Sequence, residues 1–437
     1  LYTIRSNMSI DLPNNTHQNK PVISKTKNII ASFCGSVSEW YEFVVYAFCA
    51  PFLAPLFFPA ENQFVSILAV YGAFAAGFLM RPLGAIVFGY FGDKYGRQKT
   101  VSIAVILIGL PTVVMGIMPT YHQIGIIAPI ILILVRMLQG LSVGGQFTGS
   151  AVFINEHIGI QRRYFGAGIT FAGAFFGMLL AAAVGALLTS FLNDQQLANW
   201  GWRIPFILGI FVAILGYYLK KHTSETPQFE KLKLHNALAK NPILETFKTQ
   251  KLGMLLGFFI CWLTPLIVYQ LFIFMPTYAH HYLHIDLHYA LEINAVGMMI
   301  LAVFTIIWGY VADYTGFYKV MSIAAILLII ASPLLYFLMH SMPQSFFIVQ
   351  ILFAILGAGF IGPVMGMLSH LFTINTRYSA LSISYNLGFG IFGGSAALFS
   401  MYLIEKTAVI WSPGIYLSLA AIISLIALTI ARGHMKA

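Results

Sequence analysis

Residues 89–99, which read GYFGDKYGRQK, form a short charged segment between two long apolar stretches. Charge this dense is too costly to place in hydrocarbon, so the segment predicts a loop at a membrane surface. The same frame returns about 220 residues later as GYVADYTG at 309–316. One charged turn in each half of an apolar chain predicts a duplicated membrane protein, and internal repeats are typical of secondary transporters.

The composition places the chain in a membrane. Hydrophobic residues make up 59% of it and charged residues only 9%, whereas soluble domains carry about a quarter charged residues. Apolar stretches long enough to cross a bilayer as helices recur along the chain, without the period-two alternation of a barrel. We expect an all-α integral membrane protein with twelve transmembrane helices, at about 28–58, 64–91, 100–119, 124–154, 163–191, 203–220, 252–277, 288–312, 318–339, 345–372, 378–404 and 411–432.

The net charge of +10 could suggest a nucleic-acid partner, but its distribution indicates topology instead. Twenty of the 24 Lys and Arg fall in segments that lie on one side when both termini are placed in the cytoplasm. This is the positive-inside pattern, so we predict cytoplasmic termini, the lipid bilayer as a partner and no nucleic acid.

The longest polar segment, at 221–251, divides the chain into two pseudo-symmetric six-helix bundles. We expect a cytoplasmic tail at 1–27, bundles at 28–220 and 252–432, the linker between them, and a short cytoplasmic tail at 433–437. Both halves also share an Arg-Tyr pair that opens a Gly- and Ala-rich span, at Arg163 and Arg377. We expect the substrate cavity at the interface of the two bundles.

Ionisable residues inside the predicted spans suggest the mechanism, because such groups are costly in hydrocarbon and usually functional. Glu39 and Glu42 are spaced to share one face of the first span, and Arg136 lies in the fourth span at a depth similar to Glu42. Opposite charges at one depth are expected to pair. We interpret Glu42, assisted by Glu39, as the proton-coupling carboxylate; a purely structural ion pair is the alternative.

Candidate substrate contacts are Arg136 for a carboxylate, Gln146 as a neutral polar group, and the aromatic side chains Trp40, Trp262 and Tyr269. Aromatic rings can hold an ammonium group by cation–π contact, although packing aromatics are common in membrane helices. We read the His280–His288 region as a solvated loop rather than a metal site, and no phosphate-binding glycine loop is present. We therefore expect no metal and no cofactor, with a proton gradient as the driving force.

The repeated charged loops are the candidate gate. Asp93 and Arg97 in the first copy, and Asp313 in the second, could hold neighbouring helices together in one conformation. Phe317 replaces the arginine in the second copy, so only the first can make the full set of contacts. The alternative is that these charges only anchor helix ends.

The loop pattern G-x-x-x-D-[KR]-x-G-R-x-[KR] resembles the signature of the major facilitator superfamily. Further stretches are similar to its metabolite:proton symporter family: EWYEF at 39–43, RPLG at 81–84, QGLSVGG at 139–145, WGWRIPF at 200–206, ETP at 225–227, MPTY at 275–278 and RYSAL at 377–381. The resemblance implies a proton-coupled symporter in a bacterial inner membrane, and it extends over nearly the whole chain.

The resemblance also narrows the substrate. It favours a small zwitterion such as proline or betaine; the alternatives are an organic acid such as a dicarboxylate, citrate or shikimate, and a non-transporting sensor on the same fold. Glu42 replaces the usual Asp of the family, and Gln146 replaces a common Glu, so coupling would fall to Glu42 and Glu39. We expect a monomer without enzymatic activity, and no regulation by the long heptad tail found in osmosensing members.

Overall fold

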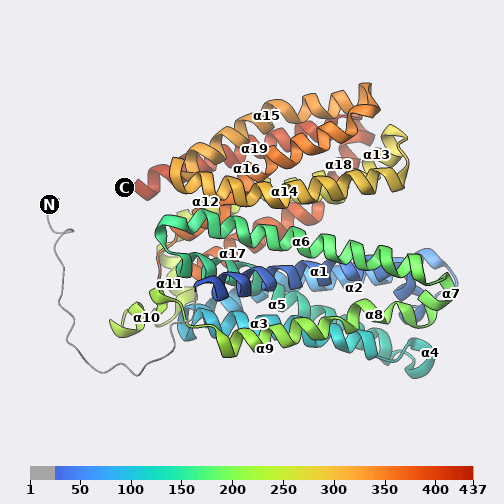
Figure 1. The fold of residues 1–437 in the computed structure, drawn as a ribbon, viewed down its shortest axis with the longest axis horizontal. Coiled ribbons are helices and arrows are strands. Elements are labelled where there is room, and N and C mark those ends of the chain that lie inside the picture. The colour runs from blue at the N-terminus through green and yellow to red at the C-terminus, as the bar shows by residue number, and fades with distance from the viewer. Residues whose placement is uncertain (1–24, 437) are drawn as a thin grey trace.

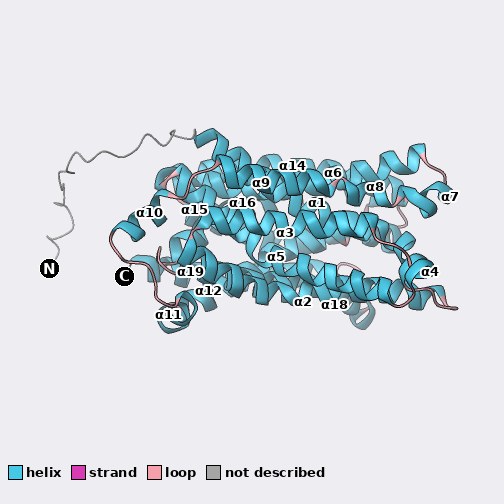
Figure 2. Cartoon of the chain, turned by 90° about the horizontal axis from the view of Figure 1, so that it is seen from below, coloured by secondary structure: helices cyan, strands magenta, loops and turns pink. Residues whose placement is uncertain are grey.

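The computed structural model describes residues 25–436, and every regular element in that range is a helix (Figures 1 and 2). Twelve stretches within it are long and apolar enough to cross a membrane, which confirms the predicted fold class. Helices suit this task because each satisfies its own backbone hydrogen bonds.

The first bundle contains α1 (Lys25–Phe57), α2 (Gln63–Tyr95), α3 (Arg97–Ile117), α4 (Tyr121–Ile124), α5 (Ile127–Ile158), η1 (Ile160–Arg162), α6 (Arg163–Phe191), α7 (Asp194–Gln196), η2 (Leu197–Gly201), α8 (Arg203–Ile207) and α9 (Gly209–His222). Two short helices follow, α10 (Pro227–Leu234) and α11 (Pro242–Thr249). The second bundle contains α12 (Lys251–Val268), η3 (Tyr269–Ile273), α13 (Met275–Leu283), α14 (Leu287–Thr315), α15 (Phe317–Ser341), η4 (Pro343–Ser345), α16 (Phe346–Leu371), α17 (Arg377–Gly388), η5 (Phe389–Gly393), α18 (Gly394–Thr407) and α19 (Ser412–Lys436).

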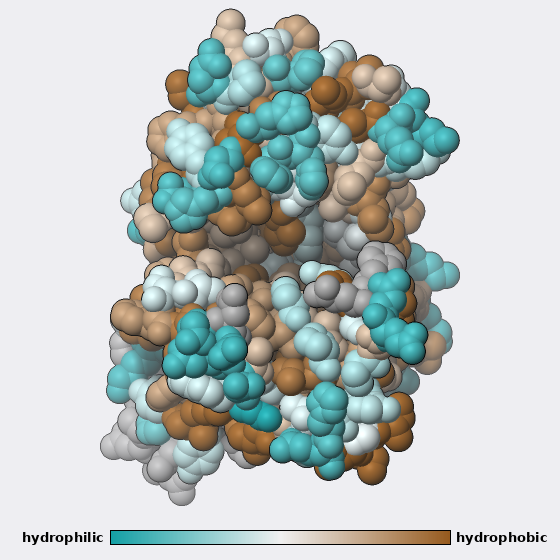
Figure 3. All heavy atoms as spheres, turned by 90° about the vertical axis from the view of Figure 1, so that its right-hand side faces the viewer, coloured by the Kyte–Doolittle hydropathy of each residue, from teal (hydrophilic) through white to brown (hydrophobic). Residues whose placement is uncertain are grey.

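The two ends of the molecule carry different short helices. The start of α1, the end of α19, and the short helices α10 and α11 lie at one end, the terminal face (Figure 1). The short helices α4, α7 and α13 lie at the opposite end, the far face (Figure 1). Figure 3 looks at the far face, where the surface is hollowed between the two halves of the molecule.

The bundles meet in a pseudo-symmetric way. The second span, α2, packs along α17 in the eleventh, and the eighth span, α14, packs along α6 in the fifth. The two contacts are therefore equivalent, because each joins the second span of one half to the fifth span of the other. The Asp-x-x-Gly turns end α2 and α14, so the repeat that the sequence displays lies at the junction of the bundles.

Small residues bring α2 and α5 close together inside the first bundle. A Cβ added at Gly77, Gly84, Gly140 or Gly144 would collide with the backbone of the other helix. Close backbone approach through glycine is a common mode of helix packing in membranes. It places the charged residues Arg81 on α2 and Arg136 on α5 beside the same cavity.

Candidate functional site

A small charged cavity lies in the first bundle at the middle of the spans. It is lined by two acids and two arginines from three helices: Glu39 and Glu42 on α1, Arg81 on α2 and Arg136 on α5. Its volume is about 30 Å³, enough for about one water molecule. The four charged side chains are each at least nine-tenths buried, so they interact in a medium that screens charge weakly.

Glu42 is the most constrained of the acids. The hydroxyl of Thr112 on α3 and the amide of Gln139 on α5, at 3.2 Å, both donate to its Oε2. Its Oε1 has no hydrogen-bond partner among the described residues. Three helices thus converge on one carboxylate that retains a free acceptor atom.

Arg136 reaches Glu42 only through a third residue, which corrects the direct ion pair expected from the sequence. Its Nη1 donates to Gln139 Oε1 at 2.8 Å, and its guanidinium lies 4.1 Å from the ring centre of Tyr46. No N–O contact within 4 Å joins Arg136 to Glu42 in the described part of the chain. Gln139, one helical turn beyond Arg136 on α5, occupies the space between them and bridges the two charges.

Arg81 was not among the sequence candidates, although it is an ionisable residue within a predicted span and that signal alone could have identified it. It is 3% exposed and lies close enough to Glu39 for their charges to interact. Its Nε donates across to Asn386 Oδ1 on α17 at 3.4 Å. Its guanidinium carbon lies 5.3 Å from the ring centres of both Phe78 and Phe389. Arg81 therefore contacts both bundles.

Aromatic side chains close the space between the bundles near the cavity. Trp40 meets Phe389 at a centroid distance of 5.8 Å, and Tyr269 meets Phe389 at 5.6 Å and Phe43 at 6.4 Å. The Nε1 of Trp40 and the hydroxyl of Tyr269 lack hydrogen-bond partners among the described residues. The structure thus brings the candidates Trp40 and Tyr269 together, one from each bundle.

Two other candidates lie apart from the cavity lining. Gln146 is fully buried and donates to the carbonyl of Gly35 at 2.6 Å, which ties α5 to α1. Trp262 stacks on Phe392 with ring centres 4.0 Å apart and an interplanar angle of 7°. Neither residue is among those that line the cavity.

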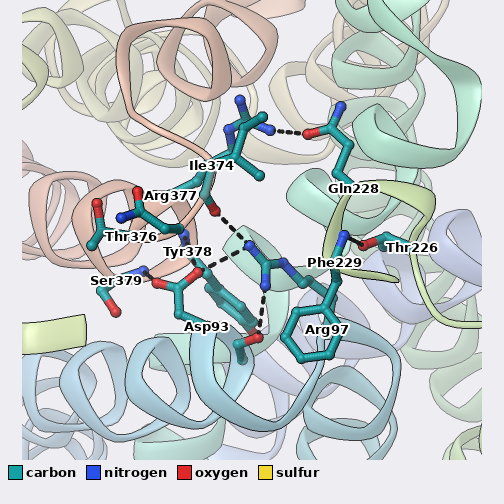
Figure 4. Close-up of polar contacts among 12 residues, drawn as sticks. Asp93, Arg97, Thr226, Gln228, Phe229, Ile374, Thr376, Arg377, Tyr378 and Ser379 are labelled. Atoms are coloured by element: carbon teal, nitrogen blue, oxygen red, sulfur yellow. Dashed lines mark hydrogen bonds and ion pairs between the residues drawn. The ribbon is translucent and has the colours of Figure 1, made fainter. Parts of the chain in front are cut away.

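Two of the three gate candidates, Asp93 and Arg97, lie where the bundles meet at the terminal face (Figure 4). The carboxylate of Asp93 accepts the backbone N–H groups of Tyr378 at 3.2 Å and Ser379 at 2.8 Å, at the start of α17. Arg97 is 3.2 Å from Asp93 and also donates to the carbonyl of Ile374 at 2.7 Å. An acid at a helix N-terminus is stabilised by the unpaired N–H groups and the helix dipole, so the first bundle caps a helix of the second.

The second copy of the turn makes the reciprocal contact. Asp313 accepts the backbone N–H groups of Tyr164 at 3.0 Å and Phe165 at 3.1 Å, at the start of α6. Each bundle therefore caps the Arg-Tyr helix of the other, and both caps join the bundles at the terminal face.

A buried acid not identified from the sequence completes this region. Glu156, near the end of α5, lies 3.5 Å from Arg97 and 3.1 Å from Arg377 on the second bundle. We call Asp93, Arg97, Glu156 and Arg377 the terminal cluster. Glu156 lies two residues beyond the end of the predicted fourth span, so its burial depends on a partner helix that a single sequence does not reveal.

The segment before α10 covers the terminal cluster. Thr226 donates to Glu156 at 2.6 Å, and Glu225 accepts the N–H groups of Arg97 at 2.9 Å and Gln98 at 3.1 Å. Burial raises the pKa of the Glu225 carboxyl, and its hydrogen bonds to backbone N–H groups and the charge of Arg97 oppose that shift. Arg377 of the second bundle also donates to the side-chain oxygen of Gln228, so the polar linker belongs to the contact between the bundles.

Comparison with known proteins agrees with this architecture. Residues 30–302 match the family model of the Major Facilitator Superfamily. A putative proline/betaine transporter of Staphylococcus aureus (strain MSSA476) is 33% identical, over 92% of this chain and 87% of that protein. The glycine betaine/proline/ectoine/pipecolic acid transporter OusA of Dickeya dadantii is 32% identical, over 92% and 82%.

Solved structures share the fold at low sequence identity. The proton:xylose symporter XylE bound to 6-bromo-6-deoxy-D-glucose superposes with a TM-score of 0.78 at 16% identity, over 92% of this chain and 94% of that one. The inward-open form of XylE from E. coli superposes with a TM-score of 0.64 at 18% identity, over 92% of this chain and 95% of that one. The family model and the transporter relatives show that the chain belongs to the Major Facilitator Superfamily and is a multi-pass membrane transporter rather than an enzyme.

Proposed function

We propose that the protein is a proton-coupled symporter that takes up a small zwitterion of the proline or betaine type. The observation that carries the proposal is the buried cavity that contains two carboxylates and two guanidinium groups. The relatives named as proline, betaine or ectoine transporters support the same substrate class.

The charge balance of the cavity favours a zwitterion over an organic dianion. Two ionised glutamates offset Arg81 and Arg136, so the cavity is neutral when both acids are deprotonated. A dianion would enter this weakly screened space without a surplus of positive charge, whereas a zwitterion adds no net charge. An organic-acid symporter remains the second candidate, because either arginine could hold a carboxylate.

Glu42 is the proposed proton carrier, with Glu39 as its assistant. The donors Thr112 and Gln139 stabilise its ionised form, and its free Oε1 can accept a proton. Gln146 cannot titrate, which leaves the two glutamates as the acids of this cavity. In this proposal Arg136 stabilises Glu42 through Gln139.

The gating step uses the two reciprocal caps. Substrate and proton would enter from the hollowed far face, and release would require Asp93 and Asp313 to leave the N-termini of α17 and α6. The basic residues of the terminal face, among them Lys94, Lys99 and Arg162, support a cytoplasmic location for that face and both termini. We further propose a bacterial inner membrane as the location and a monomer as the transporting unit, since one chain supplies both bundles.

Uptake into proteoliposomes tests the proposal. Labelled proline and glycine betaine should accumulate when an inward proton gradient is imposed, and a protonophore should abolish the accumulation. Labelled succinate and citrate serve as matched probes of the second candidate. Gradient-driven uptake of either acid, without uptake of proline or betaine, would overturn the zwitterion assignment.

A further inference from the structure

Arg81 is a buried cation that the described side chains do not neutralise by direct contact. It is 3% exposed, it lies in the second span, and no carboxylate of the described residues approaches it within 4 Å. One of its nitrogens, Nη2, is buried without any hydrogen-bond partner in that part of the chain. Glu39 offsets this charge only from beyond 4 Å, so the free nitrogen of Arg81 is available to a ligand carboxylate.

The geometry of Arg81 suits a carboxylate ligand. A guanidinium presents a planar fork that matches two carboxylate oxygens. Nε is only weakly used, by a 3.4 Å hydrogen bond to Asn386, and Nη2 is free. Arg136 differs, because its Nη1 already binds Gln139 and its guanidinium lies over Tyr46.

A cation-binding surface lies directly beside this fork. The ring of Phe389 that faces Arg81 also contacts Trp40 and Tyr269. Phe43 meets Tyr269 from the first bundle, so both bundles contribute rings. Faces of Trp, Tyr and Phe bind quaternary and secondary ammonium groups by cation–π attraction.

We propose that Arg81 binds the carboxylate of the substrate while the ring group of Trp40, Phe389, Tyr269 and Phe43 binds its ammonium group. This inference rests on the proposed function and specifies which side chains recognise each charged group of the zwitterion. The cavity beside Arg81 has a volume of only about 30 Å³, so the rings of the two bundles must separate to admit the ligand.

The same arrangement links binding to bundle movement. The Nε of Arg81 contacts Asn386, and Asn386 Nδ2 donates to the carbonyl of Gly144 at 2.7 Å, so a single path joins α2, α17 and α5. A carboxylate that takes over the Arg81 fork would compete with Asn386 for Nε. Substrate binding would thereby weaken one hydrogen bond between the bundles.

Binding of two matched ligands to the purified full-length protein tests the assignment. Glycine betaine carries both the carboxylate and the quaternary ammonium, and choline carries only the ammonium. Wild type should bind choline about 10–100-fold more weakly than betaine, as expected for loss of a charge-assisted hydrogen bond. Arg81→Gln should weaken the binding of betaine about 10–100-fold and change the affinity for choline less than about threefold. Phe389→Leu should weaken both ligands together, about 2–30-fold.

Controls separate this inference from folding and from the proposed function. Leu79→Ala, on the exposed side of α2, should bind both ligands as wild type does. Arg81→Lys retains the charge but not the fork, and should recover part of the preference for betaine if Arg81→Gln folds poorly.

Equal losses of binding for betaine and choline in Arg81→Gln, or an unchanged preference for betaine, would overturn the assignment. Absence of betaine and proline binding in wild type would overturn the proposed substrate class, and with it the zwitterion assignment. Loss of succinate binding in Arg81→Gln would then still support a carboxylate contact at Arg81.

Discussion

At the scale of single residues, the protein buries charged side chains within its membrane spans, and residues of neighbouring helices interact with them. Glu42 receives hydrogen bonds from α3 and α5, and Gln139 connects it to Arg136. Because no direct ion pair joins the acid to the arginine, a proton can be added at Glu42 without stripping Arg136 of its stacking partner Tyr46.

Glu42→Gln should abolish accumulation of proline against its gradient. Glutamine keeps the size and polarity of the side chain but cannot release a proton, so substrate exchange across the membrane should persist. Counterflow of labelled proline into vesicles preloaded with unlabelled proline measures exchange, and uptake under an imposed proton gradient measures accumulation. Glu39→Gln should show a milder loss, and wild-type accumulation in Glu42→Gln would remove Glu42 from the coupling step.

Gln139→Leu should lower the thermal stability of the purified protein. The change removes the hydrogen-bond partner of Arg136 and leaves Thr112 as the donor to Glu42, at a cost of about 1–3 kcal/mol for the unsatisfied guanidinium group. Leu138→Ala, on the neighbouring exposed position of α5, is the matched control. Melting temperatures in detergent compare the two; equal values for both variants would argue against the bridging role.

At the scale of elements, the repeated turns act on helix N-termini rather than on each other. Asp93 caps α17 and Asp313 caps α6, so each turn holds the helix of the opposite bundle that begins with Arg-Tyr. Tyr378, the second residue of α17, lies against Gly92 and Gly149, where an added Cβ would collide with its ring. The glycines thus leave room for the capped helix.

Asp93→Asn should slow uptake about tenfold and leave substrate affinity within about threefold. The amide still fits but loses the charge that favours a helix N-terminus, a loss of about 1–2 kcal/mol that shifts the balance between open and closed terminal faces. Asp313→Asn should have a smaller effect, because Asp313 is less buried and lacks an equivalent of Arg97. Initial rates across a range of substrate concentrations separate turnover from affinity. Unchanged turnover in Asp93→Asn, at equal expression, would contradict a role of this cap in state exchange.

The elements could be predicted from the sequence because hydropathy and the positive-inside pattern are properties of single helices. The repeat of Asp93 at Asp313 was also visible, since both lie in similar turns. The partners of these acids could not be predicted from the sequence. They are backbone N–H groups at the start of a distant helix, and backbone groups are the same for almost every residue type. Arg81 carried a signal in its own span, whereas the burial of Glu156 and the bridge at Gln139 depend on packing between helices.

At the scale of the whole molecule, the two faces differ in the contacts that join the bundles. Hydrogen bonds and ion pairs join the bundles at the terminal face, and the far face is hollowed between them (Figure 3). Thr148 and Ser382 lie on this junction, one from each bundle, with their hydroxyl oxygens 2.6 Å apart. A covalent link there would hold the terminal face closed.

Thr148→Cys combined with Ser382→Cys should therefore form a disulfide that blocks transport. The oxygen separation is compatible with the short Cβ–Cβ distance that a disulfide requires. Oxidation with a membrane-permeant catalyst should abolish uptake, and reduction should restore it. The single-cysteine variants, which retain the native Cys34, Cys49 and Cys261, control for other oxidation. Full uptake by the oxidised, cross-linked double variant would show that the bundles need not separate at this junction.

Proton movement during uptake tests the central claim most directly. Proteoliposomes that contain a pH-sensitive dye are given labelled proline or betaine without an imposed gradient, and internal pH and internal label are followed together. We expect the interior to acidify as substrate enters, with a fixed ratio of protons to substrate, and we expect no acidification with Glu42→Gln. Substrate entry in wild type without acidification, unaffected by a protonophore, would contradict proton coupling and the role of Glu42.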